Sequence, residues 1–524
     1  MSSTYTQPKP QRPQIQLPTV GRPESVFATE LGQIIGPTEQ LFRYDDRLVE
    51  VIEEDFTGQY DRFKLARGGL KFETFSPIRA KTWFEQYAET GIYKADPASG
   101  AQVFIAKTMS EAVSHSMTMS PQFLIHVPRI WRILDVPIPI RIANGDIVTP
   151  KAGFNSGLGI YCNPKIPALK QIPIEQARER LLKAYEGFCW KNDQSKIHAF
   201  ARLFTPYARG LIGFDERIPC WFFVGNRPRC GKDYLNGVTQ IVYLGNQFED
   251  QPLGKSSEET AKRIVAALRA GRRMMHFANC QHYLDDSAFI QAITGPTLNA
   301  RSLGATDAKS DLELANEIDY SISVNVGLGY REDVEPRCRK IQLAYYEENP
   351  NGRIFRNPYL HFWLKDNRFF ILEAIKSLFD YWRSAGAPLG ITPFNSYPRW
   401  AEIVGGMMAV SGFGDPCLPH QEDEDLLGGD MREKAMRVLF ELCYQVWPNQ
   451  WLKKSDIWDI LLKYQPNDEQ LSWFGDLNDK HKTSMRLGKC LIAFNKRILS
   501  GIHLAIDTSK VKTDQWEYYF GRTP

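Results

Sequence analysis

The sequence lacks several features that mark whole classes of protein. Its nine cysteines include no CxxC pair and its nine histidines show no HxxxH spacing. This excludes the usual structural zinc sites and a disulfide framework, and favours free thiols in a reducing cytoplasm. No run of about 18 apolar residues occurs, so no membrane span is predicted. The N-terminus lacks the apolar core of a signal peptide, and we expect a cytoplasmic protein.

The chain also lacks a strong overall charge. Its net charge is only +3 over 524 residues, so no long-range field marks the whole chain as a binder of polyanions. Any nucleic-acid surface must therefore be local. The composition is 43% hydrophobic and 24% charged, as in ordinary globular proteins, and the length predicts three or four domains.

Patterning along the chain divides it into seven segments. Five prolines among Gln, Ser and Thr predict a disordered tail at the N-terminus, because such a segment buries too little apolar surface to fold. A mixed α/β domain follows, in which Asn144-Gly145 predicts a tight hairpin. The expected segments are the tail (1–40), the N-terminal α/β domain (41–165), a helical collar (166–208), an α/β nucleotide-binding core (209–345), a helical lid region (346–420), an acidic linker (421–430) and a C-terminal domain of three helices and a strand pair (431–524).

The most informative segment runs from Trp221 to Leu235. Four apolar residues, suited to a buried parallel strand, precede a loop that ends in Gly231-Lys232 and opens a helix. In a phosphate loop, the backbone N–H groups hold phosphate oxygens and the lysine reaches the β- and γ-phosphates. The residues expected to bind ATP are Gly225, Asn226, Arg227, Pro228, Arg229, Cys230, Gly231, Lys232, Asp233 and Tyr234.

This loop departs from the common pattern in two ways. Five residues separate Gly225 from Gly231 instead of four, and Asp233 stands where Ser or Thr usually contacts the magnesium. The alternative interpretation is a glycine-bearing turn that binds no ligand. The preceding strand and the downstream motifs favour the phosphate loop.

A second departure lies on the next predicted strand of the core. P-loop enzymes place a carboxylate at its end to hold the magnesium shell, and this chain has Ala278 and Asn279 there. Since a carboxylate oxygen at position 233 can ligate Mg²⁺, we expect Asp233 to be the metal ligand. Asn279 is a candidate catalytic residue. The alternative is a site that binds ATP poorly or hydrolyses it slowly.

Two further features complete the predicted catalytic set. A third strand-like run ends in Asn325, a polar tip that can orient the attacking water. Arg337 and Arg339 precede another strand, and an arginine delivered to a neighbouring subunit's γ-phosphate stabilises the transition state. The plainer interpretation of the two arginines is a solvated basic turn.

The C-terminal block carries the strongest local charge. Residues 480–512 hold eight basic residues against one acid, Asp507, a local net charge of +7. The order of predicted elements indicates a winged helix whose basic helix contacts DNA phosphates. Its predicted inner face includes Met485, and its predicted DNA contacts are Lys482, Arg486, Lys489, Lys496 and Arg497. A protein-docking module with a solvated basic face is the alternative.

Together these residues resemble the superfamily III type AAA+ helicases of phages, plasmids and integrative elements, many of which are primase–helicases. The likeness runs from about Leu41 to the C-terminus. It is carried by Gly225–Leu235, Arg301-Ser-Leu-Gly, Val324-Asn325-Val-Gly, Asp333–Leu343, Trp400-Ala-Glu-Ile-Val-Gly-Gly and Asp146–Asn155. Ala278 departs from the Asp that is more common in this family.

The resemblance implies an AAA+ P-loop NTPase core and a hexameric ring that hydrolyses ATP with Mg²⁺ and draws one DNA strand through its pore. It also implies the cytoplasm of a bacterial or archaeal host cell. We expect a helicase part without an active primase, with a separate primase as a partner, because residues 41–165 supply no acidic triad.

Two other functions remain open. The first is an ATP-binding replication initiator with weak or no hydrolysis that binds origin DNA and recruits a host helicase, which Ala278 and Asn279 favour. The second is an AAA+ ATPase that remodels proteins, against which the basic C-terminal block argues.

Overall fold

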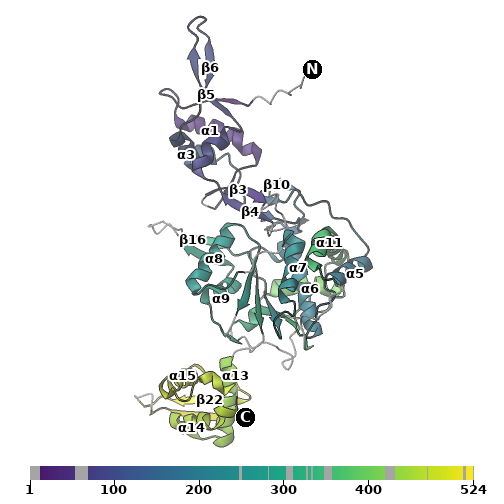
Figure 1. Ribbon diagram of the computed structural model, residues 1–524, viewed down its shortest axis with the longest axis vertical. Helices are drawn as coiled ribbons and strands as arrows, with labels where there is room; N and C mark the ends of the chain where they lie inside the picture. Colours follow the sequence, from purple (N-terminus) through teal and green to yellow (C-terminus); the bar gives the residue numbers. More distant parts are fainter. Residues whose placement is uncertain are drawn as a thin grey trace.

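The computed structural model describes the chain in a series of segments. These are residues 12–45, 47–53, 69–246, 251–280, 283–301, 311–325, 329–331, 334–346, 357–418, 431–468, 470–510 and 515–522. The predicted acidic linker 421–430 lies outside them, as do residues 1–11 of the predicted tail. Figure 1 shows an N-terminal unit, a central unit built around a sheet, and a C-terminal unit.

A parallel sheet forms the centre of the molecule. Its four strands follow the order β13 (Met274–Cys280), β17 (Asp319–Asn325), β12 (Cys220–Gly225) and β19 (Cys338–Leu343). Gln251 continues this order beyond β13, because its N–H donates to the His276 carbonyl at 3.2 Å and its carbonyl accepts from Ala278 N–H at 2.9 Å. The predicted parallel α/β core is confirmed, and all six residues of β12 are buried, as an apolar central strand requires.

Helices cover both faces of this sheet. Helices α8 (Ser257–Arg269) and α9 (Ser287–Thr294) pack on one face and share a core with Phe222 and Ile322. On the other face lie α6 (Asp193–Ile212), α7 (Lys232–Leu244) and α11 (Arg368–Ser384), around Trp221 and Phe223. Figure 1 shows the two groups on opposite sides of the strands.

The predicted helical collar and helical lid form one layer. Helix α5 (Ile174–Ala184) packs along α11, and α6 packs along α12 (Pro398–Val410). Trp400 Nε1 donates to Thr205 Oγ1 at 2.9 Å in the buried contact between α12 and α6. Helix α10 (Leu360–Asp366) packs on α7. The boundary predicted at residue 208 lies inside α6, which continues to Ile212 because its apolar face is buried along its whole length.

The prediction of a disordered tail is wrong over residues 12–40. Strand β1 (Gln14–Gln16) pairs in parallel with β5 (Glu89–Ala95), and α1 (Glu24–Ile35) follows it. Helix α1 buries Phe27, Leu31 and Ile35, which recur at helical spacing. Pro23 takes the N-cap position, where a missing N–H costs nothing. The positions of the prolines, and not their number, therefore determine whether this segment forms regular elements.

The rest of the N-terminal part is mixed α/β, as predicted. The Asn144-Gly145 hairpin is confirmed, since Gly145 has φ +92° between two antiparallel strands. The elements are β2 (Phe42–Tyr44), β3 (Arg47–Glu53), β4 (Leu70–Thr74), α2 (Pro77–Phe84), β6 (Gln102–Ala106), α3 (Glu111–Met119), α4 (Pro121–Leu124), β7 (Arg132–Leu134), β8 (Ile140–Arg141), β9 (Ile147–Val148), β10 (Gly153–Asn155) and β11 (Ile160–Cys162).

The C-terminal unit has a core of its own. Its elements are α13 (Met431–Val446), β20 (Trp451–Lys453), α14 (Lys454–Tyr464), α15 (Lys480–Ala493), β21 (Ile498–Leu499), β22 (Ile502–Asp507) and β23 (Glu517–Arg522). The strands form an antiparallel sheet in the order β20-β23-β22-β21. The predicted order of three helices and a strand pair holds, and β20 adds a strand at the edge of this sheet.

Four short strands lie beside the central sheet. They are β14 (Tyr283–Leu284), β15 (Thr297–Arg301), β16 (Asp311–Ala315) and β18 (Gly329–Tyr330). β15 and β16 form an antiparallel hairpin, which brings the backbone of Arg301 opposite Asp311. Among the described residues, no helix has the length and apolarity needed to cross a membrane.

Candidate nucleotide-binding site

The segment singled out in the sequence forms a turn from a buried strand into a helix. β12 ends at Gly225 and α7 begins at Lys232, so the loop 226–231 lies at the carboxyl edge of the parallel sheet. Arg229 has φ +66° and Gly231 has φ +101°. Left-handed residues in such a turn help the backbone N–H groups to converge, and the helix N-terminus adds a partial positive charge. A turn of this geometry is suited to an anion.

Gly225 is required by the close approach of the loop. A Cβ at this position would lie 2.3 Å from Cys230 Sγ, and the Cys230 side chain is itself buried. Burial raises the pKa of the Cys230 thiol, while the nearby Lys232 acts in the opposite direction. Cys230 thus packs as an apolar residue under the loop.

Asn226 fastens the first residue of the loop to the end of β19. Its N–H donates to the Leu343 carbonyl at 3.0 Å, and its side chain exchanges two hydrogen bonds with the backbone of Tyr345, at 3.1 and 3.0 Å. The structure therefore gives Asn226 an anchoring contact within the chain. The sequence predicted a nucleotide contact for Asn226 but not its contact with Tyr345, because only the parallel pairing of β12 and β19 brings these two residues together.

A segment between α5 and α6 closes the loop from the other side. The Cys189 carbonyl accepts from Ala344 N–H at 2.9 Å, and Lys191 N–H donates to the Gln342 carbonyl at 3.0 Å. Cys189 Sγ donates to the Cys230 carbonyl at 3.6 Å. No sequence motif predicted this second support of the loop.

The predicted binding residues differ in exposure. Lys232, the first residue of α7, is 6% exposed. Arg227, Gly231 and Asp233 are partly exposed, and Pro228, Arg229 and Tyr234 are exposed. The exposed Tyr234 ring lies 4.5 Å from the ring of His361 on α10. A ligand at this loop would thus meet the backbone and the first turn of α7 before it met Lys232.

The ends of the neighbouring strands meet the same edge. Gly225 is the register partner of Asn325, the last residue of β17, so the backbone of Asn325 lies beside the start of the loop. Asn279 is the penultimate residue of β13, where the register shifts between Phe277 and Cys280. Ala278 is buried. The three positions predicted from the sequence, Lys232, Asn279 and Asn325, therefore all belong to the carboxyl edge of the sheet.

This edge fits a nucleoside triphosphate with Mg²⁺. The loop backbone and Lys232 match phosphate oxygens, and Asp233 supplies a carboxylate in the first turn of α7. Mg²⁺ keeps several waters and usually needs one or two carboxylates besides the phosphates. Within the described segments, no group of three or more His, Cys, Asp and Glu residues could hold a metal by itself.

The two predicted arginines lie at the opposite edge of the sheet. Cys338, at the start of β19, pairs with Cys220, whereas Leu343 at its end pairs with Gly225. Arg337 ends the short helix Glu335–Arg337 just before this strand. Six strand residues rise by about 20 Å, so neither arginine reaches the loop of its own chain.

Arg339 has a partner within its own chain. Its guanidinium carbon lies 3.4 Å from the centroid of the Phe394 ring, and burial lowers the pKa of this arginine. Arg337 is half-buried as well, and it also has a contact within the chain.

The basic residues predicted to bind DNA gather on and after α15. Lys482, Arg486, Lys489 and Lys496 are exposed. Lys482 pairs with Asp479 at 3.0 Å, and Arg486 donates to the Trp473 carbonyl at 2.7 Å. The half-buried Arg497 lies 4.7 Å above the Phe494 ring, so its stem is partly committed to packing.

The prediction that Met485 belongs to the buried face of α15 is wrong. Met485 is 47% exposed, whereas Leu487, Cys490, Leu491 and Phe494 are buried as predicted. Residue 485 lies between Lys482 and Lys489 on the side of the helix that faces away from the core. The exposed stripe of α15 therefore combines basic residues with one methionine.

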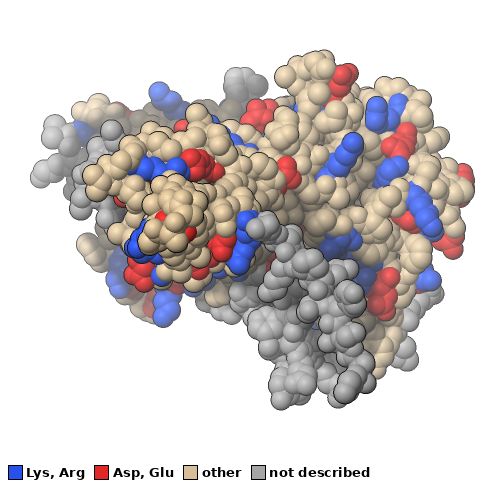
Figure 2. Space-filling view, turned by 90° about the horizontal axis from the view of Figure 1, so that it is seen from above, with Lys and Arg blue, Asp and Glu red and all other residues tan. Residues whose placement is uncertain are grey.

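Charge is distributed without a single dominant field. On the face in Figure 2, lysines and arginines alternate with aspartates and glutamates over the described residues. This agrees with the small net charge of +3.

The fold and the loop define an α/β protein with a strand-to-helix turn at the carboxyl edge of a parallel sheet. No family model matches the chain, and no curated protein matches it. Solved structures that resemble it distantly include the following two. The apo C-terminal region of NrS-1 shares 11% identity at a TM-score of 0.30 and covers 84% of each chain. SCCmec type IV Cch, described as an active helicase, shares 11% identity at a TM-score of 0.31, over 89% of this chain and 98% of that one.

Proposed function

We propose that this protein is an ATP-dependent DNA helicase that serves the replication of a phage or other mobile genetic element. The observation that carries the proposal is the position of Lys232, buried at the start of α7 behind a loop with two left-handed residues. The sequence resemblance to the AAA+ helicases supports the choice of DNA as substrate.

In this proposal each residue at the carboxyl edge has one task. The loop N–H groups and Lys232 would bind the triphosphate, and Asp233 would hold the Mg²⁺ that accompanies it. Asn325 orients the attacking water from the end of β17, and Asn279 contributes from the end of β13. Mg²⁺ supplies charge neutralisation at the transferring phosphoryl group.

The location of Arg337 supports an assembly of several copies. Because Arg337 lies at the opposite edge of the sheet from its own loop, it can stabilise the γ-phosphate only from a neighbouring protomer. A closed ring of identical chains repeats that contact between every pair of neighbours. We propose six copies, as the sequence resemblance implies, and a separate primase as a partner.

The C-terminal unit is proposed to bind DNA as a winged helix. Its support is the exposed basic stripe of Lys482, Arg486 and Lys489 on α15, together with the strand pair β22–β23. Lysine and arginine contacts to phosphates hold a duplex without reading its sequence.

One observation favours a second function. The end of β13 carries Ala278 and Asn279 and no carboxylate, so the chain lacks the usual group at the place where a P-loop enzyme activates water. The second candidate is therefore an initiator that binds ATP and origin DNA, hydrolyses ATP weakly or not at all, and recruits a host helicase.

Turnover and unwinding separate the two functions. ATP hydrolysis and the unwinding of a forked DNA are measured for the purified chain, for Lys232→Ala and for the control Lys262→Ala, which removes an exposed lysine of α8. We expect both activities to disappear in Lys232→Ala and to persist in the control. DNA binding with ATP affinity but no turnover would establish the initiator, and a protein indifferent to ATP in calorimetry would overturn both functions.

A further inference from the structure

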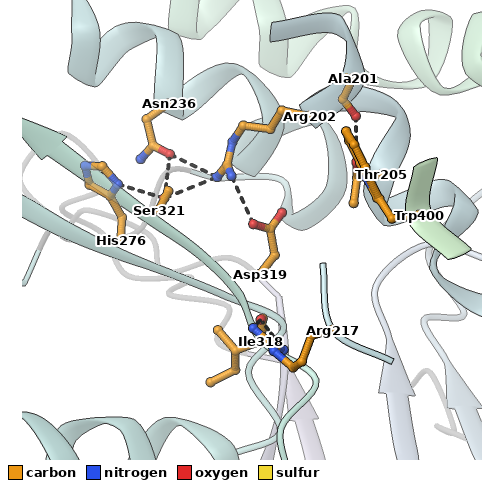
Figure 3. A network of polar contacts seen from close by, with 10 residues as sticks. All are labelled: Ala201, Arg202, Thr205, Arg217, Asn236, His276, Ile318, Asp319, Ser321 and Trp400. Atoms are coloured by element: carbon orange, nitrogen blue, oxygen red, sulfur yellow. Dashed lines mark hydrogen bonds and ion pairs between the residues drawn. The ribbon is translucent and has the colours of Figure 1, made fainter. Parts of the chain in front are cut away.

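A buried polar network connects α7 to the strand that ends at Asn325. Arg202 on α6 donates to Asp319 Oδ1 at 3.0 Å and, through its other terminal nitrogen, to Asn236 Oδ1 at 3.1 Å and Ser321 Oγ at 3.3 Å. Ser321 Oγ also donates to Asn236 Oδ1 at 3.2 Å, and His276 Nδ1 lies 2.8 Å from Ser321 Oγ. Figure 3 shows these side chains converging from α6, α7, β17 and β13.

His276 joins this network through one ring nitrogen. Its Nδ1 shares a hydrogen bond with Ser321 Oγ, and the donor of that bond depends on the tautomer of the ring. Burial lowers the pKa of His276 to about 3, and the charges of Arg202 and Lys232 act in the same direction. His276 is thus a neutral member of the network that lies close enough to sense the Lys232 charge.

The network lies directly beneath the proposed nucleotide site. Asn236 follows Lys232 by four residues on α7, so the two share one face of the helix a single turn apart. Ser321 precedes Asn325 by four residues on β17. The Arg202 guanidinium therefore joins Asn236, one helical turn from Lys232, to Ser321, four strand residues from Asn325.

Stability alone does not account for this arrangement. Arg202 is 1% exposed, and a buried ion pair is often no more stabilising than apolar side chains of the same volume. Its guanidinium also lies 5.8 Å from the Trp221 ring and 5.2 Å from the Phe223 ring on β12. One side chain therefore contacts α7, β17 and β12, the three elements whose ends form the proposed site.

We infer that Arg202 is a positioning residue that holds the Lys232 helix in register with the strand ending at Asn325, so that both meet the γ-phosphate together. The inference rests on the proposed ATPase function. Misplacement by about 1 Å can cost about 100-fold in rate, because the reacting groups no longer align. Ground-state binding, which the loop backbone dominates, depends less on this alignment.

The test compares two buried arginines in the full-length chain. Arg202→Met removes the network with an apolar side chain of similar length. Arg217→Met is the matched control, because Arg217 is 6% exposed and donates to the Asn316 and Ile318 carbonyls without touching α7. We expect Arg202→Met to lower kcat for ATP by about 10- to 100-fold with a change in KM of about 3-fold or less, and Arg217→Met to lower the melting temperature without that loss in kcat. Equal kcat losses in both variants would overturn the inference.

A second measurement decides the inference without turnover. Amide hydrogen exchange reports local opening, and we expect faster exchange in the loop 226–231 and the first turn of α7 for Arg202→Met than for Arg217→Met. If Arg202→Met does not fold, Ser321→Ala, which removes the link between Asn236 and His276, is compared with Ser323→Ala on the same strand. An absence of ATPase activity in the wild-type chain would refute the proposed function, whereas unchanged exchange in the loop would refute the positioning role.

Discussion

The guanidinium of Arg339 stacks on Phe394, 3.4 Å from the ring centroid, and lies 6.0 Å from the ring of Trp400. This contact joins β19 to the segment that leads into α12. A desolvated cation–π contact contributes about 2 kcal/mol. We therefore expect Arg339→Ala to lower the free energy of unfolding by about 2 kcal/mol or more, measured by urea titration, since packing against two aromatic rings is lost as well.

Replacing Arg337 by alanine tests its proposed contact with the γ-phosphate of a neighbouring protomer. Because Arg337 is half-buried and has a contact within the chain, Arg337→Ala should lower the free energy of unfolding by about 1 kcal/mol, less than Arg339→Ala. ATP hydrolysis by the assembled protein should fall by about 1000-fold, as for other arginines delivered between subunits. Full activity in Arg337→Ala would exclude it from the intersubunit site.

Asp233 is the one carboxylate in the first turn of α7. If it holds the Mg²⁺, Asp233→Ala should abolish the Mg²⁺ dependence of ATP binding while metal-free binding persists. Calorimetric titration of ATP with and without Mg²⁺ measures this difference. Glu258→Gln is the control, since it removes an exposed acid from the first turn of α8. Unchanged Mg²⁺ dependence in Asp233→Ala would place the metal on other groups.

Local sequence patterns predicted those parts of the fold that local chemistry determines. Four apolar residues before a glycine-bearing loop predicted β12 and α7, and the Asn144-Gly145 pair predicted its hairpin, because strand burial and turn conformation depend on adjacent residues. The predicted tail is instead ordered over β1 and α1 because its prolines lie at the ends of these elements and interrupt neither of them.

Local sequence patterns did not predict contacts between segments that are distant in the chain. The pairing of α5 with α11 joins residues about 190 positions apart, as in the Arg180–Glu373 ion pair at 3.0 Å. The anchoring of Asn226 to Tyr345 and the stacking of Arg339 on Phe394 arise in the same way. The nucleotide loop was therefore predictable as a motif, whereas its supports were not.

The buried His276 makes stability depend on pH. Its pKa is lowered to about 3 by burial and by the charges of Arg202 and Lys232, whereas in the unfolded chain it titrates near its ordinary 6.5. Below pH 6.5 the unfolded state therefore binds a proton that the native state does not, and stability falls as the pH decreases from 6.5 toward 3. His276→Gln should remove a slope of about 1.4 kcal/mol per pH unit from this window.

Urea titrations between pH 4 and pH 7 measure this slope, and His115→Gln, which replaces an exposed histidine of α3, is the control. Parallel pH curves for wild type and His276→Gln would show that His276 is protonated equally in both states.

The buried Asp135 makes stability depend on pH in the opposite direction from His276. Its carboxylate accepts from Leu70 N–H at 2.5 Å in a buried position, and burial raises its pKa to about 6. Between pH 3.8 and 6 the native state binds the proton more tightly than the unfolded chain, so stability is lost as the pH rises through this window. Asp135→Asn keeps the acceptor oxygen and removes the charge, and it should raise the free energy of unfolding at pH 7 by about 1 to 3 kcal/mol.

The benefit of Asp135→Asn should vanish near pH 4, where the native aspartate is already protonated. Asp366→Asn, at an exposed position at the end of α10, provides the control. A lower stability of Asp135→Asn at both pH values would mean that the ionised carboxylate is satisfied by its surroundings.

The basic stripe of α15 predicts how DNA binding responds to salt. Each phosphate contact releases condensed counterions, so the loss of one contact reduces the slope of log K against log salt by about 0.9 for duplex DNA. We expect Lys489→Ala to reduce the slope by about that amount, measured by fluorescence anisotropy on a labelled duplex. Lys463→Ala, which removes an exposed lysine of α14, matches the change in net charge and should leave the slope unchanged. Equal effects of the two variants would mean that the C-terminal unit attracts DNA by net charge alone, because a docked helix must distinguish a lysine on its stripe from one elsewhere on the same unit.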